Sequence, residues 1–396
     1  MCGRVAIIGA GVAGPAMALV LKKIGMVPTL YEAGTQLKDS GAGFGLAPNG
    51  LRMLDKCISH ELYCRAMEAG SHMNNGFGFY YSNGTKIHRR GMDLKDAFGY
   101  PIIGLRRHRF RELSLEQVKK EGIPIVFGSR LIGLESTKDI VKLQMTGGKL
   151  IEAEMVIGCD GIHSATRHIL FGQDKPTFTG IVSIIGLSED TVSPKGFGSE
   201  LATVLHENSS VGTYPLDGGK RMWFTKEERG VFDSEDWTST TATERMMEQM
   251  RQQVGGWMDP IPEIISKTYR AIYWGIFDRP PLTSWHSGRV VLVGDACHPM
   301  APHLGQGANT SLEDVAVLVK CLDQLSSSHP SAAFQKYQDL RKPRTTAISE
   351  NARNVGKYIY SSHPIGQRLR DPILRFSLGY LGKHLLNPVY GYKLPL

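Results

Sequence analysis

The sequence predicts an α/β fold with three parts: a Rossmann-like nucleotide-binding domain, a β-sheet domain inserted into it, and a C-terminal helical region. Three observations predict this organisation. An apolar run at residues 5–8 continues directly into a G-x-G-x-x-G motif. Two later apolar runs also end beside a glycine and an acid, at Asp160 and Asp295. Between these acids, residues 178–278 are patterned as short strands separated by turns.

The first motif has the order that a dinucleotide-binding βαβ unit requires. Its glycines have separate tasks: Gly9 permits a tight turn, Gly11 lets a pyrophosphate approach the backbone, and Gly14 allows helix and strand to pack closely. A helix-compatible segment and a second short strand follow. Glu32 stands at the end of that strand, where its carboxylate can accept hydrogen bonds from an adenosine ribose.

The composition is that of an ordinary globular protein, since 41% of the 396 residues are hydrophobic and 21% are charged. The net charge is +8, but the basic residues are scattered apart from a cluster at residues 106–111. We therefore predict attraction of anionic nucleotides and no nucleic-acid partner. Six cysteines without C-x-x-C pairs predict free thiols and no zinc site. No apolar stretch approaches the length of a membrane span, so we expect a cytoplasmic enzyme without stable membrane insertion.

The chain after Glu32 contains several further signals. Gly43 and Gly45 place flexible backbone where it can lie close to a flat or bulky group, and Asn49 can cap the next helix. Residues 74–89 predict a hairpin around an Asn-Gly turn, which is expected to contribute to the second sheet. Arg107 lies at the junction of an extended segment and a helix.

The second half of the chain follows the same logic. One helix is expected inside the sheet domain, near residues 241–254. A glycine-rich turn at 302–309 leads into a long helix, for which Thr310 and Glu313 form a capping box. From residue 332 the pattern is helical and amphipathic. The predicted boundaries are residues 1–73, 100–172 and 281–330 for the nucleotide-binding domain, 74–99 and 173–280 for the sheet domain, and 331–396 for the C-terminal helices.

Two longer motifs now join the N-terminal one. Residues 159–167 match C-D-G-x-x-S-x-x-R, and residues 294–309 match G-D-A-x-H-x-x-x-P-x-x-G-Q-G-x-N. Together the three motifs resemble the single-component FAD-dependent aromatic monooxygenases of the p-hydroxybenzoate hydroxylase and salicylate hydroxylase type. The resemblance covers about residues 4–325, with Cys159 where alanine is commoner. It implies a Rossmann-like FAD-binding domain with an inserted β-sheet substrate domain.

The resemblance also implies which residues hold the cofactor. The FAD-binding candidates are Gly9, Gly11, Gly14, Glu32, Gly43, Gly45, Arg107, Asp160, Asp295, Pro302, Gly305, Gly307, Ala308 and Asn309. Asp295 would accept hydrogen bonds from the ribityl hydroxyls, while Gly43 and Gly45 would lie against the isoalloxazine. Residues 302–309 would open a helix N-terminus toward the flavin and stabilise negative charge on the reduced ring.

Three alternatives stay open for these residues. Arg106 or Arg109 can take the place proposed for Arg107. Asp160 can be a structural turn former with Arg167 as its ion-pair partner. His298 is expected to be structural rather than catalytic.

The implied reaction is a monooxygenation. NAD(P)H reduces FAD, O2 adds at the C4a carbon of the flavin, and the resulting hydroperoxide hydroxylates or epoxidises an aromatic or other electron-rich small molecule, in natural-product metabolism. The chain has no second G-x-G-x-x-G, which argues against the two-Rossmann and Baeyer–Villiger monooxygenases. The W-x-W-x-I-P motif of flavin-dependent halogenases is not met, because Asp259 replaces its second tryptophan. The alternative is a flavin oxidase or dehydrogenase of the same fold without oxygen insertion.

The expected substrate wall is the apolar block at residues 213–216 and 222–224. Tyr214 and His206 are the candidate catalytic groups for deprotonating a phenolic substrate. No arginine occurs between Arg167 and Arg221, which predicts a neutral or larger aromatic substrate rather than a small aromatic acid.

Overall fold

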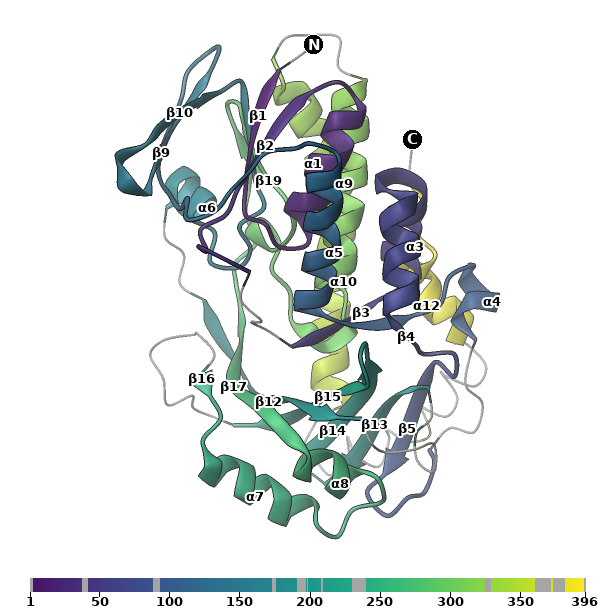
Figure 1. Ribbon diagram of the computed structural model, residues 1–396. Coiled ribbons are helices and arrows are strands. Elements are labelled where there is room, and N and C mark those ends of the chain that lie inside the picture. The colour runs from purple at the N-terminus through teal and green to yellow at the C-terminus, as the bar shows by residue number, and fades with distance from the viewer. Residues whose placement is uncertain are drawn as a thin grey trace.

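The structure is a computed structural model. It describes residues 3–37, 42–87, 93–172, 176–190, 197, 199–207, 209–229, 240–324, 329–359, 372 and 382–394. Its upper half in Figure 1 is built on a mainly parallel sheet, and its lower half on a larger, mainly antiparallel sheet.

The upper sheet has six strands, and all neighbours are parallel except the first pair. Its order is β18 (His286–Ser287), β19 (Val290–Leu292), β11 (Met155–Gly158), β1 (Arg4–Ile8), β2 (Val27–Tyr31) and β7 (Ile125–Val126). The expected βαβ unit is present, with α1 (Ala13–Lys23) between β1 and β2. The carboxyl ends of β1, β2, β11 and β19 therefore meet at one edge of the sheet.

Alternate residues of β1 pack on opposite faces of this sheet, as strand geometry requires. Val5 and Ile7 join the core formed with the helices, whereas Ala6 and Ile8 join a core beneath a small three-stranded sheet. The helices are α1, α5 (Arg107–Lys120) and α9 (Gly307–Asp323), with α10 (Ser331–Ile359) packed on α9. The small sheet consists of β8 (Leu131–Ser136), β9 (Val141–Met145) and β10 (Leu150–Ala153), and α6 (Ala165–Phe171) lies near it. Both faces of the parallel sheet are thus covered.

The lower sheet has seven strands. Its order is β16 (Thr240–Thr241), β17 (Thr268–Asp278), β12 (Thr177–Glu189), β15 (Lys220–Glu228), β14 (Ser209–Leu216), β13 (Leu201–His206) and β5 (Phe77–Tyr81). Helices α7 (Glu244–Val254) and α8 (Ile261–Ser266) cover its outer face (Figure 1). The expected helix is α7, which Thr243 caps by accepting a hydrogen bond from the Met246 amide. The sequence pattern did not predict α8.

The predicted hairpin does reach this second sheet, but by one arm. Its first arm is β5, which pairs in parallel with β13. Beyond the turn, only a single bridge between Tyr80 and Lys86 continues the pairing, and residues 88–89 lie outside the described residues.

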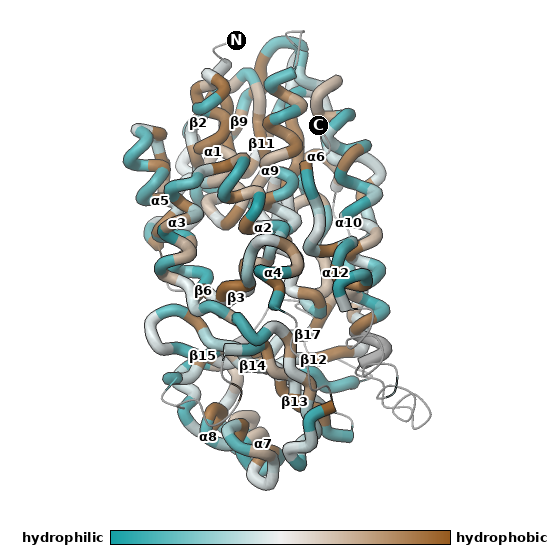
Figure 2. The backbone as a smooth tube through the Cα atoms, turned by 90° about the vertical axis from the view of Figure 1, so that its right-hand side faces the viewer, coloured by the Kyte–Doolittle hydropathy of each residue, from teal (hydrophilic) through white to brown (hydrophobic). Residues whose placement is uncertain are grey.

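A third sheet lies between the two halves, as Figure 2 shows for β3 and β6. It contains β3 (Gly43–Leu46), β6 (Ile103–Arg106) and β4 (Ser71–His72). Around it lie α2 (Pro48–Met53), the π-helical turn η1 (Leu54–Ile58), α3 (His60–Ala69), α4 (Leu94–Phe98) and α12 (Gly382–Tyr390). The short elements β7, η2 (Thr146–Gly148), η3 (Gly294–Ala296) and η4 (Pro302–Leu304) connect the longer ones.

Two predicted helix caps are wrong. Asn49 lies inside α2, which begins at Pro48, and its side chain binds α9 instead. Helix α9 begins at Gly307, before the supposed capping box, so the Thr310 hydroxyl donates to the Gln306 carbonyl. Both polar side chains serve contacts within and between helices rather than helix ends.

No helix in the described part of the chain is long and apolar enough to cross a membrane. The five cysteines that the structure describes are free thiols.

Candidate active site

The strand ends bring the acidic candidates together. Glu32, Asp160 and Asp295 follow β2, β11 and β19, three strands that lie within one sheet with β1 among them. Backbone hydrogen bonds join neighbouring ends, including one from the Gly9 amide to the Tyr31 carbonyl at 2.8 Å. The sequence-predicted convergence at one edge of the sheet is therefore present.

The three glycine positions of the first motif have different surroundings. Gly9 has a φ of 99°, and a Cβ there would lie 2.6 Å from the Cys159 carbonyl oxygen. A Cβ on Gly14 would lie 1.9 Å from the Gly9 oxygen, so close helix–strand packing excludes a side chain. A Cβ on Gly11 would meet nothing within 4 Å. The fold requires Gly9 and Gly14, while Gly11 borders open space that suits a phosphate at a helix N-terminus.

Glu32 is held by the loop that it faces. Its carboxylate accepts hydrogen bonds from the amides of Ala10 at 2.8 Å and Gly34 at 2.9 Å. It also pairs with Arg111 at 3.1 Å, and Arg111 donates to the Ala10 carbonyl at 2.6 Å. Sequence reasoning missed Arg111, whose only signal was its place in the basic cluster.

Asp160 caps α6. Its carboxylate accepts hydrogen bonds from the Ser164 hydroxyl at 2.5 Å and from the amide and hydroxyl of Thr166, both at 2.9 Å. Burial raises its pKa, although these hydrogen bonds oppose the shift. These contacts are those of a turn former, whereas Arg167 donates to the carbonyls of Ala296 and Cys297, and the predicted role of Asp160 at FAD stays a prediction.

Asp295 has a different environment. No residue that the structure describes forms a hydrogen bond or ion pair with its half-buried carboxylate. A Cβ on Gly307, the first residue of α9, would lie 3.5 Å from its Oδ1 atom. An open carboxylate beside a helix N-terminus fits hydroxyl donors of a ligand such as the ribityl chain of FAD.

The contacts of the basic cluster distinguish its arginines. The guanidinium of Arg106 holds Asp217 through Nε at 2.9 Å and Nη2 at 2.8 Å. Arg109 pairs with Glu112 at 3.4 Å. The exposed Arg107 side chain contacts no charged or polar group in the described ranges, so it is the one available for a ligand.

Packing explains the first glycine of β3 but not the second. A Cβ on Gly43 would lie 2.4 Å from a methyl carbon of Leu216, and one on Gly45 would lie 3.4 Å from Ile102. Their predicted role beside the isoalloxazine stays a prediction. Asn309 fixes this strand to the motif at residues 294–309, since it accepts from the Ala47 amide and donates to the Gly45 carbonyl.

The turn before α9 surrounds further open space. Pro302 is exposed and begins η4, and Ala308 is half-buried in the first turn of α9. Gly305 has a φ of 60°, and a Cβ there would meet nothing within 4 Å. Its carbonyl accepts a hydrogen bond from Asn309 at 3.0 Å. A side chain at Gly305 would therefore be unobstructed, and the predicted place of the flavin beside this turn stays a prediction.

A buried charge network that sequence reasoning missed lies behind this turn. Glu313 and Asp314 both pair with Arg341 at 2.7 Å. His298 contacts Asp314 at 2.5 Å, and this carboxylate raises the pKa of His298 although burial alone would lower it. Cys297, His298 and Asp314 offer ligand atoms within 4.8 Å of one another, but Arg341 already neutralises Asp314. The contacts of His298 are structural.

The two catalytic candidates lie on opposite faces of the seven-stranded sheet. Tyr214 belongs to the apolar cluster on the inner face, together with Leu216 and Met222. His206 packs its ring against Trp257 at 5.2 Å, in the region covered by α7 and α8. The structure therefore does not bring His206 to Tyr214, because their positions differ in the alternation of the sheet.

A buried cation also occupies the inner face. Lys226 shares its side of β15 with Met222 and Phe224, and its ammonium lies 5.3 Å from the Phe224 ring centroid. Burial lowers the pKa of Lys226 to about 7. Burial and the nearby Lys226 charge together lower the pKa of His303, in η4, to about 3.

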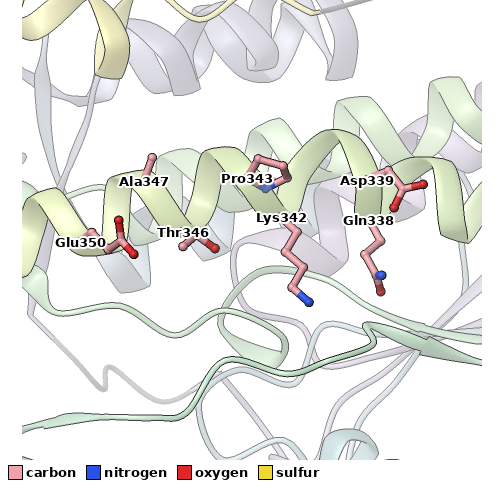
Figure 3. Close-up of a pocket in the computed structure, with 7 residues that line it drawn as sticks. All are labelled: Gln338, Asp339, Lys342, Pro343, Thr346, Ala347 and Glu350. Carbon is pink, nitrogen blue, oxygen red and sulfur yellow. The ribbon is translucent and has the colours of Figure 1, made fainter.

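A cavity of about 380 Å³ lies elsewhere, along α10 (Figure 3). Its lining residues are Gln338, Asp339, Lys342, Pro343, Thr346, Ala347 and Glu350. None of them comes from the strand ends or the apolar cluster, so this cavity is separate from the candidate site.

Known proteins share this architecture. The family model described as FAD binding domain matches residues 3–352. The chain is 32% identical to a 3-amino-4-hydroxybenzoate 2-monooxygenase of Streptomyces platensis, covering 93% of this chain and 91% of that protein. It is 29% identical to the 6-hydroxynicotinate 3-monooxygenase of Bordetella bronchiseptica, covering 87% and 89%.

The fold also matches solved structures. A Klebsiella pneumoniae HpxO variant complexed with FAD superposes with a TM-score of 0.85 at 22% identity, covering 98% of both chains. The three motifs, the shared sheet edge and the match over most of the chain agree. The chain therefore belongs to the FAD-binding domain family, among the FAD-dependent aromatic monooxygenases.

Proposed function

We propose that this chain hydroxylates a small aromatic acid that already carries a ring hydroxyl group, with FAD, NAD(P)H and O2. The observation that carries the proposal is the Tyr214 hydroxyl, which is buried and donates to the Met222 sulfur at 2.9 Å. A thioether is a weak acceptor, so a substrate hydroxyl can replace it at little cost. Burial raises the pKa of Tyr214, which favours a neutral hydroxyl that donates and accepts rather than a base.

The acidic substituent is supported from two directions. Lys226 is a buried amine on the same face of the sheet as Met222, and an acidic substituent beside it would favour its charged form. The relatives named above act on 3-amino-4-hydroxybenzoate and 6-hydroxynicotinate, both of which are hydroxylated aromatic acids. This proposal replaces the expectation of a neutral substrate. That expectation rested only on the absence of arginine from residues 168–220 and did not take lysine into account.

The cofactor roles follow from the same geometry. Asp295 accepts from the ribityl hydroxyls, Arg107 attracts the diphosphate, and Gly11 leaves room for it. Glu32 binds the adenosine ribose, and residues 302–309 lie along the ring. FAD, when bound and reduced by NAD(P)H, supplies the oxygen-activating chemistry. The apolar cluster around Tyr214 excludes water from the reacting ring.

Matched substrate pairs test the proposal. 3-Amino-4-hydroxybenzoate is compared with 2-aminophenol, and 6-hydroxynicotinate with 2-hydroxypyridine, so that each pair differs only in the carboxylate. The acid is expected to stimulate NAD(P)H oxidation and to gain one labelled oxygen from ¹⁸O₂. Stimulation by the neutral partners alone would refute the acid substrate. Product without label would indicate the oxidase or dehydrogenase alternative.

A Tyr214→Phe variant tests whether the Tyr214 hydroxyl binds the substrate. It is expected to retain FAD but to raise KM and to divert NAD(P)H into hydrogen peroxide, because the ring hydroxyl is no longer held. Unchanged KM and unchanged coupling would remove Tyr214 from the site.

A further inference from the structure

The C-terminal helix α12 ends inside the apolar cluster that contains Tyr214. Tyr390 is 5% exposed, and its ring lies parallel to Phe77 with the centroids 6.4 Å apart. The Phe98 ring approaches it edge-on at 5.8 Å. These three rings come from α12, β5 and α4. Tyr390 therefore contacts parts of the chain that are distant in the sequence.

Arginines fix the backbone around Tyr390. Arg52, on α2, donates to the carbonyls of Tyr390 at 3.1 Å and Tyr392 at 2.8 Å. Arg344, on α10, donates to the carbonyls of Pro388 at 2.6 Å and Val389 at 2.9 Å. Because these bonds hold the main chain, they do not depend on which side chain occupies position 390.

The ring of Tyr392 adds a further anchor. It lies beneath the guanidinium of Arg344, 4.0 Å from ring centroid to Cζ, and Arg341 approaches the same ring at 5.1 Å. Both arginines also pair with Glu313, on the helix that begins beside Asp295. Through these two arginines, the C-terminal segment is thus linked to α9, the helix that follows the turn at residues 302–304.

The cluster is continuous from Tyr390 to that turn. It includes Tyr214 and Met222 on the sheet and Ala47 after β3. The Ala47 amide donates to Asn309, which also binds the Gly305 carbonyl. Because Tyr214 and Tyr390 belong to one cluster, a ring that binds at Tyr214 would meet the aromatic group of Phe77, Phe98 and Tyr390 on extension.

We propose that Tyr390 is a specificity-determining residue: its ring forms the end wall of the substrate site and limits substrates to a single aromatic ring. The proposal rests on the proposed function and deepens it. The ring, not the hydroxyl, sets the limit, because the neighbours of Tyr390 are apolar.

Substrate size tests the proposal. Salicylate and 1-hydroxy-2-naphthoate differ by one fused ring, and their dissociation constants are measured on the FAD-loaded enzyme through perturbation of the flavin spectrum. Tyr390→Ala is expected to shift preference toward the naphthoate by about tenfold. Tyr390→Phe is expected to keep the wild-type preference. Leu385→Ala is the matched control, since Leu385 is 51% exposed on the same helix.

A second readout needs no substrate. Iodide quenching of the bound-flavin fluorescence is expected to rise in Tyr390→Ala and to stay unchanged in Leu385→Ala, because loss of the ring opens the flavin side to solvent. Should Tyr390→Ala fail to fold, Tyr390→Leu keeps most of the apolar volume and carries the same two expectations.

The outcomes are separable. Unchanged preference together with unchanged quenching in Tyr390→Ala, or in Tyr390→Leu where it replaces Tyr390→Ala, would overturn the end wall. If no aromatic acid is hydroxylated by the wild type while quenching rises in Tyr390→Ala, the proposed function fails and the placement of Tyr390 stands. If the acids are hydroxylated and neither readout moves, only Tyr390 is refuted.

Discussion

Arg106 holds Asp217 with both its backbone and its side chain. The Arg106 amide donates to one carboxylate oxygen at 2.5 Å, and the guanidinium engages the other at 2.8 and 2.9 Å. Arg106 ends β6 in the sheet between the two halves, and Asp217 begins the turn between β14 and β15 of the lower sheet. This pair therefore fixes the strand that carries Tyr214 to the middle sheet, one residue before Arg107.

Removing Asp217 is expected to loosen this junction. Asp217→Ala leaves the Arg106 guanidinium without its carboxylate and should lower the free energy of unfolding by about 2 kcal/mol, below the range for fully buried pairs because the Arg106 side chain is 27% exposed. Urea unfolding measures the loss. Glu189→Ala removes an exposed partner of Lys220 and should cost under about 1 kcal/mol. Equal losses in both variants would contradict the special role of the junction.

Asp295→Asn is expected to weaken FAD binding about 10- to 100-fold, because a charged acceptor of hydroxyl groups is lost. Fluorescence titration of the apoprotein with FAD gives the dissociation constant. The exposed Asp323 lies at the other end of α9, and Asp323→Asn changes the net charge equally. A preparation of Asp295→Asn as yellow as the wild type would count against the assignment.

The arginine cluster offers a paired comparison. Arg107→Ala should raise the FAD dissociation constant about tenfold, since the proposed diphosphate contact is lost. Arg109→Ala should leave it unchanged, because Arg109 already pairs with Glu112. The same titration decides between them, and an effect confined to Arg109→Ala would reverse the assignment.

Local sequence patterns predicted the strand ends and the first motif well. Strand, glycine turn and acid are consecutive, so Gly9, Glu32 and Asp295 could be located without tertiary information. The choice among the three arginines could not be made in this way, because Asp217 is distant in the sequence. Lys226 and Tyr390 were missed for the same reason. Only the pairing of β15 places Lys226 beside the apolar cluster, and only the packing of α12 brings Tyr390 into it.

Side chains that can serve either of two roles also limited what the sequence could predict. Asn49 and Thr310 are residue types that often cap helices. In the structure, however, Asn49 donates to Glu313 on α9, and the Thr310 hydroxyl donates to the Gln306 carbonyl one turn earlier. His206 and Tyr214 were both reasonable acid–base candidates, and only the alternation of the folded sheet separates their faces.

The buried Lys226 predicts a pH-dependent stability. Its pKa is lowered from 10.5 to about 7 by burial, so the unfolded chain binds more protons than the folded one between these values. Stability therefore rises with pH across that window, and the cost of burying the charge is fully present below pH 7. Lys226→Met should be a few kcal/mol more stable than the wild type at pH 6. The difference should vanish by about pH 10.5.

Thermal and urea unfolding at several pH values follow this difference. Lys95→Met, at an exposed position of α4, should show no such trend. A gain for Lys226→Met that is constant with pH would mean that the lysine binds protons equally in the folded and unfolded chain, and it would refute the lowered pKa.

Gly11 and Gly14 separate cofactor binding from folding. In Gly11→Ala the new methyl group meets no protein atom within 4 Å, so the apoprotein should unfold at the wild-type temperature. The methyl group would occupy the space proposed for the pyrophosphate, so FAD affinity should fall by at least about tenfold. In Gly14→Ala the Cβ would lie 1.9 Å from the Gly9 oxygen, which forces α1 away from β1 and should destabilise the apoprotein itself. Calorimetry of the apoproteins and FAD titration together distinguish the two effects, and a destabilised Gly11→Ala apoprotein would show that this glycine serves the fold.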